Sequence, residues 1–296
     1  MRRVEILAPA KINLHLEVGP SRADGFHHIT SLFQAVSLYD RLTFSLTDNT
    51  AEILIHGDFN CSPESNLIYK AIQLFRKSAV DDRGIEVFVD KKIPSEAGLG
   101  GGSSDAAATL KALSLLLEYK PGEKGMMDMA AALGSDVPFF MKSASAAVSG
   151  RGEILEDIGV PPHLEGLIVR AAGEGISTAA AYKAVDEAMA AGKLSQGLLS
   201  KEDMISSFHS IEPSEWPFYN SFMETYRNHF KPIEFIYKLL YDSGAVFSGL
   251  SGSGSALFGI FSRQGSIEEA EQTLNEQFPF VERIYFLNSI PDALVI

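Results

Sequence analysis

Hydrophobic and polar residues alternate in several stretches of the first half of the chain. The alternation is clearest within residues 3–19, where every second residue from Ile12 to Val18 is apolar, and it returns at Leu42–Leu46, Ala51–Ile55 and Gly84–Asp90. Successive side chains of a strand point to opposite faces of a sheet, so this spacing predicts strands with one buried face. We therefore expect a sheet in this half of the chain.

Apolar residues recur every three or four positions in the segments between and after these stretches. This spacing begins after Asn66, whose side chain is suited to capping a helix. It recurs over Ala106–Leu117 and from about Lys124 to Leu133, whereas Ala144–Ser149 is again compatible with a strand. Three helices packed on the sheet are the expected result.

The second half of the chain has a different order of elements. In sequence, we predict a strand at Gly166–Arg170, helices at Thr178–Ala191 and Pro232–Tyr241, paired strands at Ala245–Leu250 and Ala256–Phe261, a helix from a Ser266 cap to Phe278, and a strand at Val281–Leu287. This is the split βαβ order of a ferredoxin-like fold. Residues 193–230 are polar and aromatic and give no clear assignment. The strongest break is Gly159-Val160-Pro161-Pro162, so we divide the chain into domains 1–160 and 161–296.

Composition and charge narrow the class of protein. Of the 296 residues, 46% are hydrophobic and 21% are charged, as is usual for a folded globular protein. The formal net charge of −13 argues against a general nucleic-acid binder. The single cysteine, Cys61, excludes an intramolecular disulfide, and there is no apolar run of about 18 residues that would span a membrane. We expect a cytoplasmic monomer or weak homodimer that binds neither nucleic acid nor a membrane.

A glycine-rich stretch joins the predicted strand at Gly84–Asp90 to the helix at Ala106–Leu117. It consists of Ser95, Glu96, Ala97, Gly98, Leu99, Gly100, Gly101, Gly102, Ser103, Ser104 and Asp105. Glycines allow a tight turn and let several backbone N–H groups point to one place beside the positive end of the helix dipole. Such an arrangement binds phosphate. The alternative is a flexible Gly/Ser connector that precedes a well-capped helix.

Two known phosphate motifs do not match this stretch. The P-loop requires Gly-Lys-Ser/Thr after its second glycine, and no lysine stands there. The dinucleotide fingerprint requires a third glycine where this chain has Ser103. We therefore expect a phosphate loop of another kind.

A phosphate loop without a lysine leaves two tasks to other residues, namely neutralising the transferred charge and taking the proton of the acceptor. The candidates are Lys11, which lies between apolar neighbours, and Asp136, which precedes the apolar run Val137–Met141. Each also has a simpler interpretation. Lys11 could extend along the surface, and Asp136 could be a turn or cap residue.

Together with the glycine-rich loop, these residues resemble the GHMP kinase family. The matching motifs, in family order, are Pro9-Ala10-Lys11-Ile12-Asn13-Leu14, Asp24-Gly25-Phe26-His27, Ala97–Asp105, Gly134-Ser135-Asp136-Val137-Pro138 and Ser251-Gly252-Ser253-Gly254. The first two motifs resemble most the branch of the family that phosphorylates the 2-hydroxyl of 4-diphosphocytidyl-2-C-methyl-D-erythritol in non-mevalonate isoprenoid precursor synthesis.

The resemblance implies a two-domain α+β fold, with an N-terminal domain like the second domain of ribosomal protein S5 and a ferredoxin-like C-terminal domain. It implies ATP and Mg²⁺ as cofactors, with residues 95–105 around the ATP phosphates and a hydroxyl of Ser103 or Ser104 near Mg²⁺. Asp136 would take the proton of the acceptor hydroxyl. Lys11 would hold Asp136 ionised and offset charge on the acceptor oxygen.

The resemblance also implies that the small-molecule substrate is a cytidine diphosphate derivative. Asn13 and His27 would hold it, and Phe26 and Tyr182 would cover the two faces of the cytosine, although both aromatic residues could instead belong to the core. The placement of Tyr182 depends on an alignment of Gly175–Thr178. The segment Val169–Glu174, which precedes these residues, departs from the family pattern. The alternatives are another GHMP kinase acting on mevalonate, homoserine or a sugar, and a nucleotide-binding regulator without catalysis.

Overall fold

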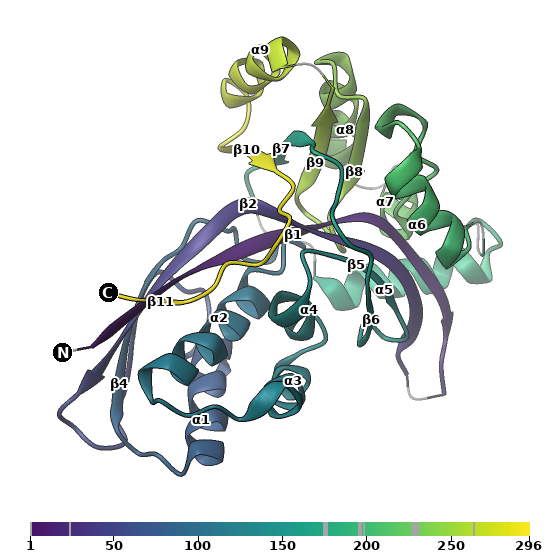
Figure 1. Ribbon diagram of the computed structural model, residues 1–296. Coiled ribbons are helices and arrows are strands. Elements are labelled where there is room, and N and C mark those ends of the chain that lie inside the picture. Colours follow the sequence, from purple (N-terminus) through teal and green to yellow (C-terminus); the bar gives the residue numbers. More distant parts are fainter. Residues whose placement is uncertain are drawn as a thin grey trace.

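A sheet of seven strands and a sheet of four strands organise the molecule. The computed structural model describes residues 2–23, 25–173, 177–194, 197, 199–226, 231–262 and 264–296. In Figure 1 the helices α1 to α4 cover one side of the larger sheet, and the smaller sheet lies on the opposite side. This arrangement agrees with the α+β class predicted from the sequence.

The first part of the chain supplies most of the larger sheet and its helices. In order, it forms β1 (Arg3–Ser21), β2 (His27–Thr47), β3 (Ile53–His56), a 3-10 turn (Pro63–Ser65), α1 (Leu67–Ala79), β4 (Gly84–Asp90), α2 (Gly101–Leu116), α3 (Gly122–Leu133), α4 (Val137–Lys142), β5 (Ser145–Ser149) and β6 (Ile154–Asp157). As predicted, the side chain of Asn66 caps α1 by accepting a hydrogen bond from the backbone N–H of Ile68. The alternating residues of β4 are likewise confirmed as a half-buried strand.

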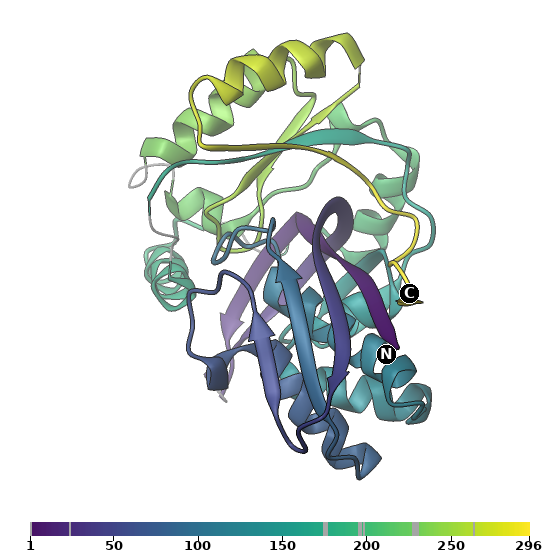
Figure 2. The same ribbon diagram turned by 90° about the vertical axis from the view of Figure 1, so that its left-hand side faces the viewer.

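The remaining elements form the smaller sheet and its surroundings. They are β7 (Glu165–Arg170), α5 (Thr178–Ala190), α6 (Lys201–Ser210), a 3-10 turn (Pro213–Glu215), α7 (Ser221–Tyr226), α8 (Lys231–Asp242), β8 (Phe247–Leu250), β9 (Leu257–Phe261), α9 (Gln264–Asn275), β10 (Phe280–Tyr285) and β11 (Leu294–Val295). The four strands follow the order β10-β7-β9-β8 and are antiparallel throughout. That order confirms the ferredoxin-like prediction. Figure 2 shows α9 lying over this sheet.

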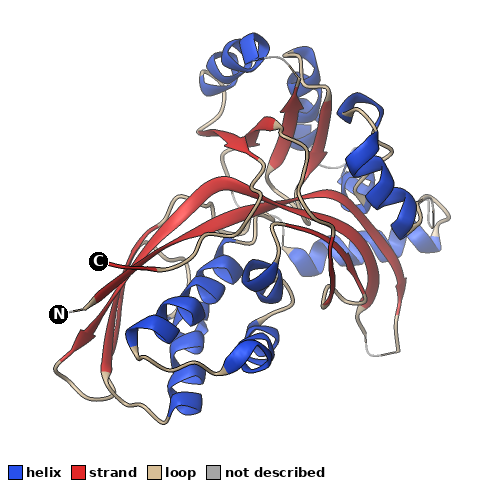
Figure 3. Cartoon of the chain, in the orientation of Figure 1, coloured by secondary structure: helices blue, strands red, loops and turns tan. Residues whose placement is uncertain are grey.

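The larger sheet is built around the long antiparallel pair β1–β2. Its order is β11-β1-β2-β4-β3, with β5 paired to β2 and β6 paired to β5. Figure 3 shows these two long strands crossing the middle of the molecule, with helices on both sides of them. The short β11 pairs with β1, so the end of the chain returns to the sheet in which the chain began.

Two irregularities in β1 decide which side chains face the helices. The pairing register with β2 shifts between Pro9 and Ala10 and again between Asn13 and His15. Such bulges change the face of the sheet to which the side chains between them point. Ala8 and Leu16 therefore belong to the core cluster under the helices, whereas Ala10, Ile12 and Leu14 belong to the second core cluster. The continuous alternation from Ile12 to Val18 predicted a single apolar face, and the bulges show that this was wrong.

Several element boundaries also differ from the predictions. α2 begins at Gly101 and not near Ala106, so the second half of the glycine-rich stretch is helical. α9 begins at Gln264, two residues before the predicted start at Ser266. The strands β6 and β11 were not predicted, and residues 193–230 contain α6 and α7. Asp24, Gly175 and Ile176, which belong to predicted motifs, lie outside the described residues. Among the described residues, no helix combines the length and apolar character needed to cross a membrane.

Candidate active site

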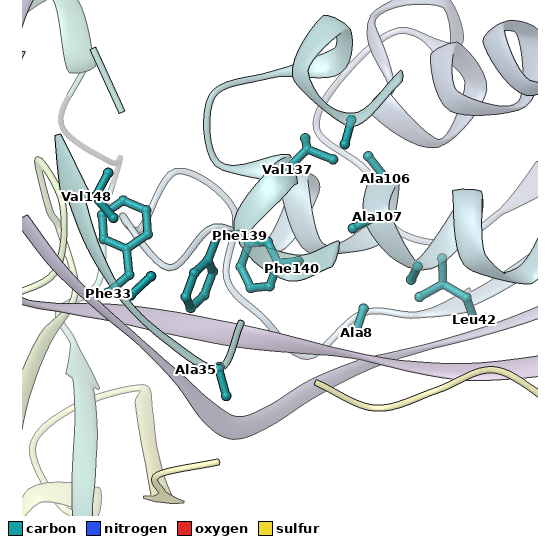
Figure 4. Packing of buried hydrophobic residues seen from close by; sticks show 14 of the residues in the cluster. Ala8, Phe33, Ala35, Leu42, Ala106, Ala107, Val137, Phe139, Phe140 and Val148 are labelled. Atoms are coloured by element: carbon teal, nitrogen blue, oxygen red, sulfur yellow. The ribbon is translucent and has the colours of Figure 1, made fainter. Parts of the chain in front are cut away.

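Lys11 and Asp136 lie close together in the structure. Lys11 lies in β1 between the two bulges and is 3% exposed. Asp136 directly precedes α4, which Phe139 and Phe140 anchor in the core, as Figure 4 shows. The Lys11 Nζ and Asp136 Oδ2 atoms are 3.9 Å apart. The structure thus brings together two residues that are 125 positions apart in the sequence.

Burial and neighbours hold the Lys11 ammonium in place. It donates a hydrogen bond to Asn13 Oδ1 and lies 4.6 Å from the centre of the Phe33 ring. Burial lowers the pKa of Lys11, and the charge of Asp136 offsets only part of that effect. The simpler interpretation of Lys11 as a surface residue is therefore wrong.

The Asp136 carboxylate does not cap the helix that follows it. No backbone N–H of α4 donates to its side chain, and about a third of the side chain (32%) is exposed. It lines a cavity of about 780 Å³, which we call the central cavity. A carboxylate held in this way is available to a bound ligand.

A second cavity of about 1050 Å³, which we call the loop cavity, lies beside the central one. Its lining includes Lys91, Lys92, Ser95, Glu96 and Gly98. Both cavities share Gly98, Thr178 and Ser253, so they meet at the glycine-rich loop. A ligand in one cavity can therefore reach a ligand in the other at this point.

The glycine-rich loop passes directly over Lys11. The backbone N–H of Lys11 donates to Leu99 O at 2.9 Å, and a Cβ on Gly100 would lie 3.1 Å from the Lys11 side chain. α2 starts at the end of this loop, and the first N–H groups of a helix have no partner within it. They are oriented to bind an anion beside Lys11.

Two members of the predicted phosphate stretch turn their side chains away from both cavities. Ser104 is buried against β1 beside Ala8 and Pro9, so its hydroxyl does not face a nucleotide. Asp105 is buried too and accepts a hydrogen bond from Lys91 Nζ at 2.8 Å. Burial raises the pKa of Asp105 to about 7, although the charge of Lys91 opposes the rise. Of the two serines considered for Mg²⁺, Ser104 therefore has its hydroxyl buried away from both cavities.

The sequence did not indicate Asp40, which supports the start of the loop. Its carboxylate is fully buried, pairs with Lys91, and accepts hydrogen bonds from the N–H groups of Lys92 and Ile93 at 2.6 and 2.9 Å. Burial lowers the pKa of Lys91, but the charges of Asp105 and Asp40 outweigh it, so the net effect raises this pKa. Lys91 is therefore a fixed cation at the floor of the loop cavity.

Gly98 is the point where the two glycine-containing loops touch. Its φ is +77°, and a Cβ placed on it would lie 1.9 Å from Ser251 O in the loop between β8 and β9. The Ser251 hydroxyl donates to Gly98 O at 2.9 Å, and the Gly252 N–H donates to Asn13 Oδ1 at 2.8 Å. Only glycine permits this approach, which closes the site between the two sheets.

We expect Gly98→Ala to lower the free energy of unfolding by about 3 kcal/mol or more, because it combines a backbone overlap with a left-handed φ. Displacing the loop should also lower kcat/KM for ATP at least about tenfold. The matched control is Gly122→Ala, since Gly122 has a φ of +79° but open space around it. It should cost only about 1–2 kcal/mol and leave activity intact. Urea unfolding measures the loss of stability in each variant, and steady-state kinetics measures the loss of activity. An equal loss of stability in the two variants would contradict the close contact of Gly98 with Ser251.

Phe26, His27 and Tyr182 form one wall of the central cavity. Phe26 is 54% exposed and lies under the Arg151 guanidinium, 4.9 Å from its ring centre. His27 is buried, and its Nδ1–H donates to Gly19 O at 3.0 Å. The Tyr182 ring stacks on His27, with 5.0 Å between ring centres. Burial and the nearby Asp136 charge raise the pKa of Tyr182.

Asn220 was missed because it lies in the unassigned stretch 193–230. Its side-chain amide donates to Leu250 O and Gly252 O at 2.8 and 2.9 Å and accepts from the Phe222 N–H at 2.8 Å. Phe222 in turn packs edge-on against Tyr182. Asn220 therefore ties the second glycine loop to the aromatic wall. A lone asparagine in an aromatic segment carries no local signal of this role.

Comparisons with known proteins agree with this geometry. Residues 66–144 match the family model for the N-terminal domain of GHMP kinases, and residues 205–279 match that for the C-terminal domain. A 4-diphosphocytidyl-2-C-methyl-D-erythritol kinase from Chlorobium phaeobacteroides is 34% identical over 94% of this chain and 96% of its own length. One from Thermosipho melanesiensis is 37% identical, covering 86% and 90%.

Solved structures show the same fold. A crystal structure of 4-(cytidine 5'-diphospho)-2C-methyl-D-erythritol kinase superposes with a TM-score of 0.80 at 31% identity, covering 95% of this chain and 98% of that one. A homoserine kinase from Cytophaga hutchinsonii superposes with a TM-score of 0.72 at 16% identity, covering 99% and 97%, and supports the fold alone. With both family models matched and relatives aligned over nearly its whole length, the chain belongs to the GHMP kinase family.

Proposed function

We propose that this chain transfers the γ-phosphoryl group of ATP to the 2-hydroxyl of 4-diphosphocytidyl-2-C-methyl-D-erythritol. One observation carries the proposal: the Lys11–Asp136 pair lies in the central cavity, directly under the loop where that cavity meets the loop cavity. An acceptor in the central cavity and ATP in the loop cavity would place their reacting atoms at this pair. The relatives that carry this activity in their names align over nearly the whole chain.

ATP would lie in the loop cavity, with its phosphates against the glycine-rich loop. The N–H groups at the start of α2 would offset the phosphate charge. The tight packing of Gly98 and Gly100 keeps the loop backbone close to Lys11. Most of the rate acceleration in phosphoryl transfer comes from such positioning and electrostatics.

Asp136 would act as the general base. As the acceptor oxygen bonds to the γ-phosphorus, the hydroxyl proton passes to the Asp136 carboxylate and ADP leaves with the electrons of the broken P–O bond. Lys11, 3.9 Å away, would keep Asp136 ionised and stabilise charge on the acceptor oxygen. Because Asn13 accepts hydrogen bonds from both Lys11 and Gly252, it would fix Lys11 and one side of the acceptor.

Mg²⁺ would reach this site with the nucleotide. No cluster of three metal-ligating side chains occurs among the described residues, which suits an ion held mainly by phosphate oxygens and water. Of the two serines considered, Ser104 is buried away from the cavities, which leaves the Ser103 hydroxyl as the candidate to approach Mg²⁺. The ion would neutralise charge on the transferred phosphoryl group.

The aromatic wall would bind the cytosine. Phe26 and Tyr182 line the central cavity beside His27, and aromatic side chains at such a place suit a flat base. Mevalonate, homoserine and small sugars have no flat ring, so the wall favours a nucleotide-linked acceptor over them. We also propose that residues 1–160 supply most of the ATP site and residues 161–296 supply Tyr182 and the second glycine loop.

ADP release with Mg-ATP and a panel of acceptors tests the proposal. The panel contains 4-diphosphocytidyl-2-C-methyl-D-erythritol, mevalonate, homoserine and galactose. We expect turnover with the first acceptor only. Turnover with another member instead would contradict the role of the aromatic wall, and ATP binding without any turnover would favour the non-catalytic regulator.

A further inference from the structure

Asn220 lies directly before α7, against β1 and beside the second glycine loop, which comprises residues 251–256 between β8 and β9. Its side chain is buried, and its amide donates to Leu250 O and Gly252 O while its Oδ1 atom accepts from the Phe222 N–H. Carbonyls only accept and an N–H only donates, so these partners fix the orientation of the amide. The side chain cannot turn without losing all three hydrogen bonds.

Gly252 connects Asn220 to Asn13 of β1. The carbonyl of Gly252 accepts from Asn220 at 2.9 Å, and its N–H donates to Asn13 Oδ1 at 2.8 Å. The other end of the Asn13 amide donates to Ser31 Oγ at 3.0 Å. The same Asn13 Oδ1 atom accepts a hydrogen bond from the Lys11 ammonium. The groups from Asn220 to Lys11 therefore form one continuous series of hydrogen bonds.

This series determines where the Lys11 ammonium lies. Asp136 is 3.9 Å away, which is too far for a hydrogen bond to fix the ammonium. The Phe33 ring, 4.6 Å away, attracts the charge without selecting one direction for its N–H groups. Of the contacts that the described residues make with this ammonium, only the one with Asn13 is a hydrogen bond.

We propose that Asn220 is a positioning residue for phosphoryl transfer. Through Gly252 and Asn13, it holds the Lys11 ammonium in the place from which it acts. This inference rests on the proposed function, because the position of the ammonium affects the rate only when it acts on Asp136 and the acceptor oxygen. Asn220 itself lines neither the central cavity nor the loop cavity, so it would contact neither substrate.

The test is a double-mutant cycle on kcat with the wild type, Asn220→Ser, Lys11→Met and the double variant. Serine can still cap α7, but it lacks the amide that donates to two carbonyls. We expect Asn220→Ser to lower kcat about tenfold or more and to leave KM for ATP nearly unchanged. In Lys11→Met, the same substitution should change kcat less than about twofold, because the ammonium that it displaces is absent.

Tyr226→Phe is the matched control within the same loop. The Tyr226 hydroxyl donates to Ser253 O at 3.2 Å, so it supports the second glycine loop at a residue outside the series that ends at Lys11. Any loss of kcat in Tyr226→Phe should therefore be the same factor in the wild type and in Lys11→Met. This control separates the positioning of Lys11 from a general loosening of the loop.

Two results overturn the inference. One is an unchanged kcat in Asn220→Ser, and the other is a loss of kcat by the same factor in the wild type and in Lys11→Met. If Asn220→Ser does not fold, Asn220→Asp replaces it in the cycle, since aspartate keeps the size of the side chain and the cap but removes the amide.

A second measurement separates this inference from the proposed function. If the wild-type protein turns over none of the acceptors, the proposed function fails, and the labelling of Lys11 then decides the inference. Acetylation by acetic anhydride is read by mass spectrometry relative to Lys70, which is exposed on α1. Lys11 should be acetylated roughly two- to tenfold faster in Asn220→Ser than in the wild type, because its hydrogen bond is weakened. Equal rates contradict the inference.

Discussion

Asp136→Asn is expected to lower kcat about 10²- to 10⁴-fold while KM for ATP stays nearly the same. Asparagine keeps the shape of the side chain but cannot take the proton of the acceptor hydroxyl. The substitution also removes the negative charge that Asp136 places 3.9 Å from the Lys11 ammonium. ATP should still bind, because Asp136 lines the central cavity and not the loop cavity.

Single-turnover phosphoryl transfer with both substrates saturating measures this effect on the chemical step. Asp128→Asn is the matched control, since Asp128 is an exposed aspartate on α3 that lines neither cavity. It should retain wild-type kcat. If Asp136→Asn instead raised KM for the acceptor without lowering kcat, Asp136 would be a binding residue and another group would have to take the proton.

Much of the fold could be predicted because it depends on local patterns. The alternation in β4, the helical spacing of α1 and the order of elements from β7 to β10 each specify a type of element, and the antiparallel order β10-β7-β9-β8 follows from them. The short strands β6 and β11 were missed because four and two residues are too few to show a period.

The two bulges in β1 show why local patterns are not sufficient. Residues 12 to 18 alternate without interruption in the sequence, yet the register shift between Asn13 and His15 divides them between two core clusters. The segment between the two shifts places the Lys11 ammonium over the ring of Phe33 and beside Asn13, with the Lys11 backbone bonded to the glycine-rich loop. Bulges depend on how two strands pair, so a single strand's sequence does not reveal them.

Some residues of the candidate site could be predicted from the sequence, and others could not. Lys11, Asp136 and the glycine loop were found through family motifs, and the structure brings them together. Asp40 and Asn220 act through hydrogen bonds to backbone groups that are distant in sequence. Nothing in their own segments distinguishes them from ordinary polar residues. Supporting residues of this kind become visible only when the partners are placed in space.

Lys11→Met is expected to abolish most of the activity without weakening the fold. The ammonium is buried, and burying a charge costs free energy. Its contacts with Asn13, the Phe33 ring and the Asp136 carboxylate at 3.9 Å repay that cost only in part. Methionine fills similar space over the Phe33 ring. Asn13 Oδ1 keeps the hydrogen bond from Gly252, and the partly exposed Asp136 can be hydrated. We expect kcat to fall at least about 10²-fold, with a free energy of unfolding equal to the wild type or up to about 2 kcal/mol higher.

The difference in free energy of unfolding between the wild type and Lys11→Met should change with pH in a direction that follows from the pKa of Lys11. Burial lowers the pKa of Lys11 in the folded protein below its ordinary value of 10.5, so the unfolded chain binds more protons between the two values. The free energy of unfolding of the wild type should therefore rise, relative to Lys11→Met, as the pH rises through that window. Urea unfolding at several pH values measures the difference, and Lys70→Met, at an exposed position of α1, should show no such trend. A Lys11→Met protein that is less stable at every pH would mean that the ion pair with Asp136 holds the two segments together, and its loss of activity would then reflect a disordered site and not a missing charge.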